Sequence, residues 1–451
     1  LGINLSLPCC RCLVSISGLA AIPRRPMCVR MQALHFIQFT LLCYFMCAQC
    51  NGRSSNSMSP STMNSNTSSS KSTSTRTAAS KTIMPLMPLR TQGRYILDAS
   101  GKRVKLKCAS WSGAQEKWYV PSGLWAQHRS VIAAMAQQAG LNCIRLVWST
   151  EMALRSANSS ISVPAAALSA NPDLQGKGPL QVLDAVIAAI AKQGLMVVLD
   201  NHSSDAMWCC EITDGNGLWY TARWSEQQWL QGWRVVAQRY ANVAAVVGVG
   251  LRNEPRPTFV NFQLRFPSWG SGGALTDITI AYEKAAAVVL AAKPRALVFA
   301  QGVLAGRDLR GVRQRPLVLR AAWPLGQVVA NQLVYEAHEY PFLWGDFNFT
   351  DYATYSARLD ASWGFIVKEG KAPIWLGEFG VAHTAAGISS PWWKAITRYI
   401  RENSLDWAYW PLDGQQGPSR KQGAEETYGL LNATWDGWAY APLVEELRAL
   451  S

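Results

Sequence analysis

Short apolar runs alternate with longer amphipathic stretches along the chain, from about residue 94 to the C-terminus. The longer stretches repeat apolar residues at helical spacing, whereas runs of four to eight apolar residues between them are typical of buried parallel strands. Helices are predicted at Pro179–Lys192, Trp224–Tyr240, Asp277–Ala292, Tyr352–Lys368, Trp392–Glu402 and Ala441–Leu450. Strands are predicted at Val104–Ser110, Asn142–Trp148, Leu195–Asn201, Val246–Asn253, Ala296–Gln301, Leu333–His338, Pro373–Phe379 and Asp406–Pro411.

Eight strands separated by helices in about 350 residues favour a (β/α)8 barrel, the TIM barrel of the α/β class, over an open doubly wound sheet. A dinucleotide-binding sheet would carry Gly-x-Gly-x-x-Gly after its first strand, and this chain does not. An N-terminal β-hairpin is predicted before the barrel, in which Arg94–Leu97 pairs with Val104–Ser110 across a turn at Asp98–Lys102. Gly302–Gly326 has no clean helical pattern, so no fifth helix is predicted there.

The net charge of +14 is concentrated at the N-terminal end of the chain. Residues 1–97 contain ten Lys or Arg and no acidic residue, and Asp98 is the first acid. The remainder is nearly neutral, which argues against a nucleic-acid-binding surface. The apolar fraction of 49% excludes a disordered or fibrous protein. No apolar run reaches the roughly 18 residues of a transmembrane helix, so stable membrane insertion is not expected.

Residues 1–50 are interpreted as a leader that contains a signal peptide at 31–50. Met31 precedes an apolar stretch from Phe36 to Ala48, which has the length of a secretory signal. An acid-free, Arg-containing leader is also typical of an organelle transit peptide, so secretion and organelle import both remain open. Residues 51–90 are interpreted as a disordered linker because 17 of the 31 residues from Asn51 to Lys81 are Ser or Thr. The folded body is therefore predicted at 91–451.

Four cysteines belong to the body, and three pairings of Cys108, Cys143, Cys209 and Cys210 remain open. The chain has no Cys-x-x-Cys pair, and its five histidines are scattered. His338-Glu339 lacks the second histidine of a zinc-binding His-Glu-x-x-His helix. Neither a metal nor another cofactor is expected.

Polar side chains follow the predicted strands at the ends where the chemistry of a barrel gathers. Any one of them has a plain structural explanation, such as an ion pair or a helix cap. Glu254 and Glu378, however, lie at the ends of the fourth and seventh strands and would face one cavity. Two carboxylates that flank a bond are what glycoside hydrolysis requires. The other polar or aromatic residues at strand ends are Arg145, His202, Asn253, His338, Tyr340 and Trp410.

The ordered motifs resemble glycoside hydrolase family 5, and in particular its cellulase-like plant and algal members. They are Asn142-Cys-Ile-Arg-Leu-Val-Trp148, Leu199-Asp-Asn-His202, Met207-Trp-Cys-Cys210, Asp214-Gly-Asn-Gly217, Leu251-Arg-Asn-Glu-Pro255, His338-Glu-Tyr340, Leu376-Gly-Glu-Phe-Gly380, Asp406-Trp-Ala-Tyr-Trp410 and Tyr428-Gly-Leu-Leu-Asn432. The resemblance covers most of the body and implies that 91–451 is a catalytic domain.

The resemblance also implies a role for each residue at the strand ends. Glu254 would be the acid/base, with its neutral form favoured by the charge of a second carboxylate nearby. Glu378 would be the nucleophile, kept ionised by Arg145 and by a hydrogen bond from Tyr340. A family of this kind retains the anomeric configuration, which requires carboxyl groups about 5–5.5 Å apart. Asn253 would bind the sugar 2-hydroxyl, His202 and His338 would donate to sugar hydroxyls or carboxylates, and Trp410 would stack under the ring.

Tryptophans in the predicted loops are further candidates for sugar stacking, whereas Trp229 and Trp233, four residues apart in a predicted helix, are expected in the core. The loop candidates are Trp208, Trp219, Trp224 and Trp344.

The leading interpretation is a secreted, monomeric retaining β-glycosidase that hydrolyses β-linked glucans, mannans or their oligosaccharides. A transglycosylase using the same site is an alternative, because a sugar can replace water as the acceptor. A non-catalytic carbohydrate-binding protein on a decayed barrel is the alternative from another class. In each of these interpretations the binding partner is a carbohydrate, and binding of nucleic acid is not expected.

Overall fold

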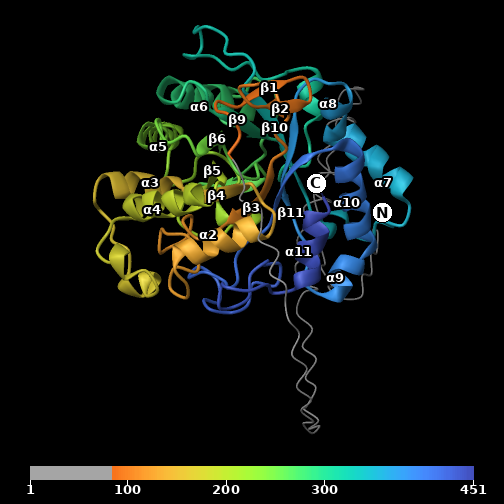
Figure 1. Ribbon diagram of the computed structural model, residues 1–451. Coiled ribbons are helices and arrows are strands. Elements are labelled where there is room, and N and C mark those ends of the chain that lie inside the picture. The colour runs from red at the N-terminus through yellow and green to blue at the C-terminus, as the bar shows by residue number, and fades with distance from the viewer. Residues whose placement is uncertain (1–83, 451) are drawn as a thin grey trace, which may run out of the picture. The chain divides into compact units, whose positions relative to one another are not determined.

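The computed structural model describes residues 84–450, and within them eight parallel strands close into a barrel (Figure 1). The order around the barrel is β10-β11-β12-β3-β4-β5-β6-β9, so consecutive strands of the chain are neighbours. All eight predicted strands are present, and the predicted (β/α)8 fold is confirmed. Their bounds are β3 Lys107–Trp111, β4 Cys143–Ser149, β5 Met196–Ser203, β6 Val246–Gly250, β9 Leu297–Gln301, β10 Leu333–Glu339, β11 Ile374–Phe379 and β12 Asp406–Tyr409.

Helices follow the strands and cover the outside of the barrel (Figure 1). The six predicted helices are found, and three unpredicted ones, α2, α3 and α9, follow β3, β4 and β11. No helix in the described chain is long and apolar enough to span a membrane. The bounds are α2 Arg129–Gln138, α3 Thr150–Ala157, α4 Pro179–Lys192, α5 Glu226–Arg239, α6 Ile278–Ala292, α7 Tyr352–Leu359, α8 Phe365–Lys368, α9 Ala385–Ser389, α10 Pro391–Asn403 and α11 Ala441–Arg448.

Two departures from regular helix occur where the sequence pattern is interrupted. Between β9 and β10 the only helical segment is the short 3-10 turn Arg310–Arg313, in agreement with the missing fifth helix. The predicted helix Tyr352–Lys368 is divided by a π-helical segment at Asp360–Gly364. Tyr399 donates to Asp360 Oδ1 at 2.6 Å, and a Cβ on Gly364 would lie 2.0 Å from the Tyr399 hydroxyl. The absence of a side chain at Gly364 therefore allows α10 to approach this segment closely.

The N-terminal hairpin is present, but its predicted pairing was wrong. Strand β2, Tyr95–Leu97, pairs with β1, Arg90–Gln92, whereas Val104–Ser110 supplies barrel strand β3. Only a single bridge, between Leu97 and Arg103, remains of the predicted ladder. A run of seven residues that suits a hairpin strand equally suits a barrel strand, and closure of the barrel decided the outcome. The leader at 1–50 and most of the linker at 51–90 lie outside the described residues, and the end of that range packs on the body, since Leu89 is buried.

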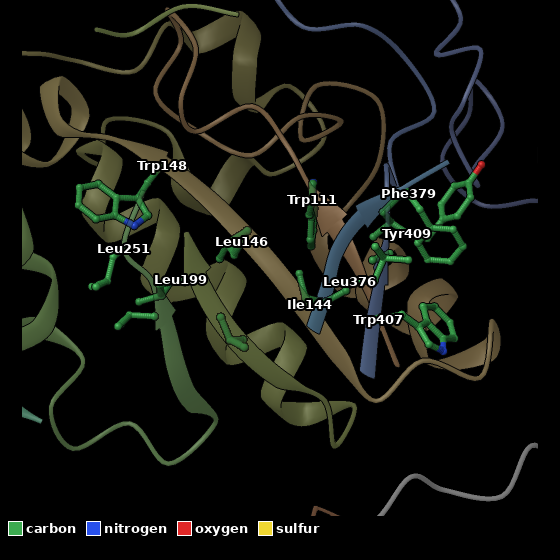
Figure 2. Close-up of a cluster of buried hydrophobic side chains, with 14 of the residues drawn as sticks. Trp111, Ile144, Leu146, Trp148, Leu199, Leu251, Leu376, Phe379, Trp407 and Tyr409 are labelled. Carbon is green, nitrogen blue, oxygen red and sulfur yellow. The ribbon is translucent and has the colours of Figure 1, made fainter. Parts of the chain in front are cut away.

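Strand β4 places alternate side chains on opposite faces. Ile144, Leu146 and Trp148 point outward into the apolar layer between strands and helices, where Figure 2 draws them. Trp148 meets Trp233 of α5 edge to face, with ring centroids 4.8 Å apart, and both Trp229 and Trp233 are fully buried, as predicted. The remaining residues point into the barrel, because side chains alternate along a strand.

The inward residues of β4 fall in three layers. Cys143 lies in the apolar cluster at the N-terminal ends of the strands and forms a disulfide with Cys108 of β3. Arg145 lies one layer higher, and Val147 lies above it in a small cluster with Tyr340 and Trp410. The lower part of the barrel is therefore an apolar core crosslinked by a disulfide, and polar side chains begin at the level of Arg145.

Candidate active site

The structure brings all eight predicted site residues together at the C-terminal ends of the strands. Side-chain contacts join them into one network: Glu378 touches Arg145, Tyr340 and His338, and His338 touches Glu254. The second branch runs from Arg145 through Asn253 and His202 to Trp410. Strands β4, β5, β10 and β11 each contain a member, and other members follow β6 and β12, so the barrel itself sets the geometry of the network.

Arg145 is the buried centre of this network. Its guanidinium contacts Glu378 Oε1 at 2.6 Å and Asp200 Oδ1 at 3.0 Å, and Glu336 Oε1 is 3.4 Å away. Burial alone would lower the pKa of Arg145, but the charges of Asp200, Glu378 and Glu336 raise it. A fully buried charge is tolerated only when it is paired and hydrogen-bonded, and here three carboxylates meet one guanidinium. Arg145 therefore fixes the position of Glu378.

Glu254 and Glu378 face each other across His338. A carboxylate oxygen of each residue and a ring nitrogen of His338 all lie within 4.8 Å of one another. His338 Nδ1 is 3.1 Å from Glu254 Oε1 and 3.6 Å from Glu378 Oε2, while Nε2 is 3.1 Å from Glu336 Oε1. Tyr340 donates to Glu378 Oε2 at 3.1 Å. The two carboxylates are thus close enough to act on the same bond.

The backbone at Glu254 is held in an unusual conformation. Its φ is +43°, a region that residues with a Cβ rarely adopt, and such outliers persist where surrounding contacts fix them. The Glu254 N–H donates to Gln301 Oε1 of β9, and the preceding N–H of Asn253 donates to Asn201 O at 2.9 Å. Arg256 donates to the Glu254 carbonyl at 2.9 Å. These bonds aim the Glu254 side chain at His338.

The protonation of Glu254 differs from the prediction. Burial alone would raise its pKa, but the hydrogen bond from His338 and the charge of His338 lower it. Burial alone would likewise lower the pKa of His338, but the charge of Glu378 and the hydrogen bonds to Glu254 and Glu336 raise it to about 10. The prediction that a second carboxylate favours neutral Glu254 was wrong because an imidazolium lies between the two carboxylates. The site therefore holds its proton on His338.

His202 and Trp410 form the other side of the site. Their rings are stacked, with centroids 5.2 Å apart and planes 2° from parallel. His202 Nδ1 lies 3.0 Å from Asp200 Oδ2, which leaves Nε2 facing the Asn253 amide. Trp208 lies against Trp410 with centroids 5.8 Å apart. These indoles offer an apolar face of the kind on which a sugar ring can stack.

Three members of the network were missed in the sequence. Asp200 lies two residues before His202, and Glu336 lies two residues before His338. Because side chains alternate along a strand, residues two apart share the inward face, and this spacing could have identified both. Gln301 is the last residue of β9. The search for polar residues at strand ends, which found the other members, could have identified it.

The other loop tryptophans do not all reach the site. Trp219 is buried and donates to Glu226 Oε2 at 2.7 Å, so its assignment as a sugar-stacking candidate was wrong. Trp344 is packed edge to face against Phe347 and donates to Glu339 Oε2 at 2.8 Å. Of the four candidates, Trp208 is the one whose ring contacts Trp410.

Two groups within the described residues have the spacing of a metal site, and neither fits a metal in its present form. His202, Cys209 and Cys210 form one group, but the two cysteines are joined in a disulfide and a metal requires thiolates. Glu254, His338 and Glu378 form the other, but the buried Arg145 guanidinium already pairs with Glu378 at 2.6 Å and would repel a second cation there. With a proton donor, a fixed carboxylate and an aromatic platform, the arrangement suits acid–base and nucleophilic chemistry.

Comparison with known proteins agrees with this arrangement. The family model "Cellulase (glycosyl hydrolase family 5)" matches residues 97–416. An endoglucanase of Paenibacillus polymyxa is 31% identical over 77% of this chain and 83% of its own length. The major extracellular endoglucanase of Xanthomonas campestris pv. campestris is 33% identical over 76% of this chain and 67% of its own. The structure of its catalytic domain superposes with a TM-score of 0.66 and 30% identity, covering 80% of this chain and 99% of that domain. The chain therefore belongs to glycosyl hydrolase family 5 and is a cellulase-like glycoside hydrolase.

Proposed function

We propose that the protein hydrolyses the β-glycosidic bonds of glucan chains by double displacement, with retention of the anomeric configuration. The observation that carries the proposal is the approach of Glu254 and Glu378 to within 4.8 Å, with His338 between them. Retaining enzymes place their carboxyl groups about 5–5.5 Å apart, whereas inverting enzymes leave about 6.5–9.5 Å for a water. The short separation therefore favours attack by Glu378 itself.

In the first step, a Glu378 oxygen attacks the anomeric carbon as the bond to the leaving oxygen breaks. Glu254 gives a proton to that oxygen. The proton comes from His338 Nδ1, which lies 3.1 Å from Glu254 Oε1. As Glu378 forms its bond, its negative charge is consumed, and with it a main cause of the raised pKa of His338. The proton then moves to Glu254 and on to the leaving group as the chemistry requires it.

In the second step, a water attacks the anomeric carbon and Glu254 accepts its proton. Glu378 leaves as a carboxylate, which Arg145 and Tyr340 receive through the contacts of 2.6 and 3.1 Å. Asn253 donates to the sugar 2-hydroxyl, a contact that strengthens as the oxocarbenium-like transition state forms. Trp410 stacks under the ring at the cleaved bond.

Substrate and location follow from the same observations. Relatives at 31 and 33% identity are named endoglucanases, which supports a β-linked glucan as the substrate and cleavage within the chain. Two disulfides in the described part of the chain support a location in an oxidising compartment. One relative is named extracellular, and we propose that this protein is also secreted.

Replacing His338 with asparagine tests the proton-holding role. The variant removes the charge that lowers the pKa of Glu254, so burial raises that pKa. In the wild type the basic limb of the kcat/KM profile reports loss of the proton from His338, whose pKa is raised to about 10. In the variant Glu254 must hold that proton alone, so the basic limb is expected to move to lower pH. The value at the optimum is expected to fall about tenfold or more. His128→Asn is the matched control, because His128 caps α2 and asparagine caps equally well. A basic limb that stays in place or moves to higher pH contradicts this role.

The function is tested with soluble β-1,4-glucan, mixed-linkage glucan, β-mannan and the corresponding oligosaccharides. New reducing ends with a rapid fall in the viscosity of the glucan are expected. Activity confined to mannan would replace the proposed substrate. No product from any of these substrates, in a protein with a cooperative thermal transition, would overturn the proposal in favour of a carbohydrate-binding protein.

A further inference from the structure

The Cys209–Cys210 disulfide lies against the amide of Asn253 inside the candidate active site. Asn253 Nδ2 is 3.8 Å from Cys209 Sγ and 3.5 Å from Cys210 Sγ. The other end of the amide is fixed, because Oδ1 accepts from Arg145 at 2.8 Å. Asn253 is 1% exposed. The two sulfurs therefore border the only amide in the network that faces both the arginine and the platform of His202 and Trp410.

These neighbours leave the Asn253 amide hydrogens without a strong acceptor. A sulfur is a weak acceptor, and the remaining partner, His202 Nε2, lies 3.5 Å away, at the limit of a hydrogen bond. A buried donor with weak partners retains most of its capacity for an incoming hydroxyl. A carboxylate or carbonyl at the place of the disulfide would compete with the substrate for the same hydrogens.

The disulfide is expected to contribute little to the free energy of unfolding of the whole domain. A disulfide stabilises a fold mainly by closing a loop in the unfolded chain, and this one joins adjacent residues. The surrounding loop is held by other contacts: Asn216 accepts from the N–H groups of Ser204 and Asp205, and Arg256 pairs with Asp214 at 2.6 Å. The effect of the disulfide is therefore local to the side chains it touches.

The loop also connects the disulfide to the aromatic platform. Trp208 directly precedes Cys209, lies against Trp410 and is covered by the Arg420 guanidinium, 3.4 Å from its ring centroid. The disulfide that contacts the Asn253 amide is therefore adjacent in the chain to one of the indoles that border the site.

We propose that the Cys209–Cys210 disulfide is a positioning element of the subsite for the sugar ring that Glu378 attacks. It keeps the Asn253 amide directed at the C2 hydroxyl of that ring and forms an apolar wall beside it. The inference rests on the proposed function and deepens it, because it makes a free C2 hydroxyl a requirement of the substrate.

The test measures how much the C2 hydroxyl contributes with and without the disulfide. Two substrates are compared, an aryl β-cellobioside and its analogue that lacks the 2-hydroxyl on the ring bearing the aryl group. For Cys209→Ala/Cys210→Ala we expect kcat/KM on the parent substrate to fall at least about tenfold. The analogue should lose far less, so the advantage conferred by the 2-hydroxyl should shrink about tenfold. Cys108→Ala/Cys143→Ala is the matched control, because it removes a disulfide buried away from the network and should keep that advantage.

A disulfide that only clasps the loop would give an equal loss on both substrates, and this result, or no loss at all, would overturn the inference. If the variant fails to fold, the folded wild-type protein is treated with a water-soluble phosphine. The phosphine gives two electrons to the sulfurs and leaves as its oxide, while one water supplies the oxide oxygen and the two thiol hydrogens. The reagent reaches the partly exposed Cys210 before the buried Cys108–Cys143 pair. The same shrinkage is then expected. Inactive wild-type protein would overturn the proposed function together with the inference, whereas active protein with an unchanged 2-hydroxyl advantage would overturn the inference alone.

Discussion

Replacing Glu378 with glutamine is expected to lower kcat/KM on an aryl β-cellobioside by about ten-thousandfold or more. An amide cannot form the covalent intermediate, so the double displacement loses its first step. The structure should persist, because glutamine can still accept from Arg145 through its oxygen, as Glu378 does at 2.6 Å. The measurement is steady-state kinetics with thermal unfolding of the same samples.

Glu369→Gln is the control for the Glu378 variant. Glu369 is an exposed carboxylate that pairs with Arg313 at 2.7 Å, outside the network. The kcat/KM of the Glu369→Gln variant should match that of the wild type within about twofold. Activity of Glu378→Gln within about tenfold of the wild type, at unchanged stability, would exclude Glu378 as the nucleophile.

Replacing Glu254 with glutamine is expected to give a loss that depends on the leaving group. On cellotetraose, whose leaving oxygen must be protonated, kcat/KM should fall by about a hundred- to ten-thousandfold. On a dinitrophenyl β-cellobioside, which leaves without a proton, kcat/KM should fall far less. Breakdown of the glycosyl-enzyme then becomes slow, since no base activates water. Added azide, which needs no base, should speed turnover and yield a β-glycosyl azide.

Gln301→Glu is not a suitable control for Glu254, because it would place a new charge beside the Glu254 N–H. Glu425→Gln is matched instead, since Glu425 is an exposed carboxylate that contacts a histidine, His383, at 2.9 Å. The Glu425→Gln variant should have an unchanged kcat/KM on both substrates. An equal loss of Glu254→Gln on both substrates, without a response to azide, would contradict the acid/base role.

The alternation of strands and helices could be predicted because each barrel strand is buried on both faces and therefore reads as a short apolar run. The pairing within the N-terminal hairpin could not be predicted, because the partner strand, Arg90–Gln92, lies in a segment without a strong hydrophobic period. The π-helical segment at Asp360–Gly364 could not be predicted from the hydrophobic pattern either, since it depends on the approach of Tyr399 from another helix. These features depend on contacts between elements, which local periodicity does not contain.

Eight members of the site could be predicted because each lies in or shortly after a strand that was visible in the sequence. Their electrostatics could not. The direction of the Glu254 pKa depends on which group lies between Glu254 and Glu378, and only the three-dimensional arrangement places His338 there. The same limit applies to Glu336, which supports the charge of His338 from the opposite ring nitrogen at 3.1 Å. Sequence motifs thus identified the residues but not their protonation.

The most direct test of the double displacement is to trap the glycosyl-enzyme. A dinitrophenyl 2-deoxy-2-fluoro-β-cellobioside slows both steps, because fluorine destabilises the oxocarbenium-like transition state, while the good leaving group keeps the first step the faster one. Peptide mapping of the inactivated protein by mass spectrometry should place one fluorinated cellobiosyl group on Glu378. A label on Glu254, or inactivation without any covalent label, would contradict the central claim that Glu378 is the nucleophile of a retaining enzyme.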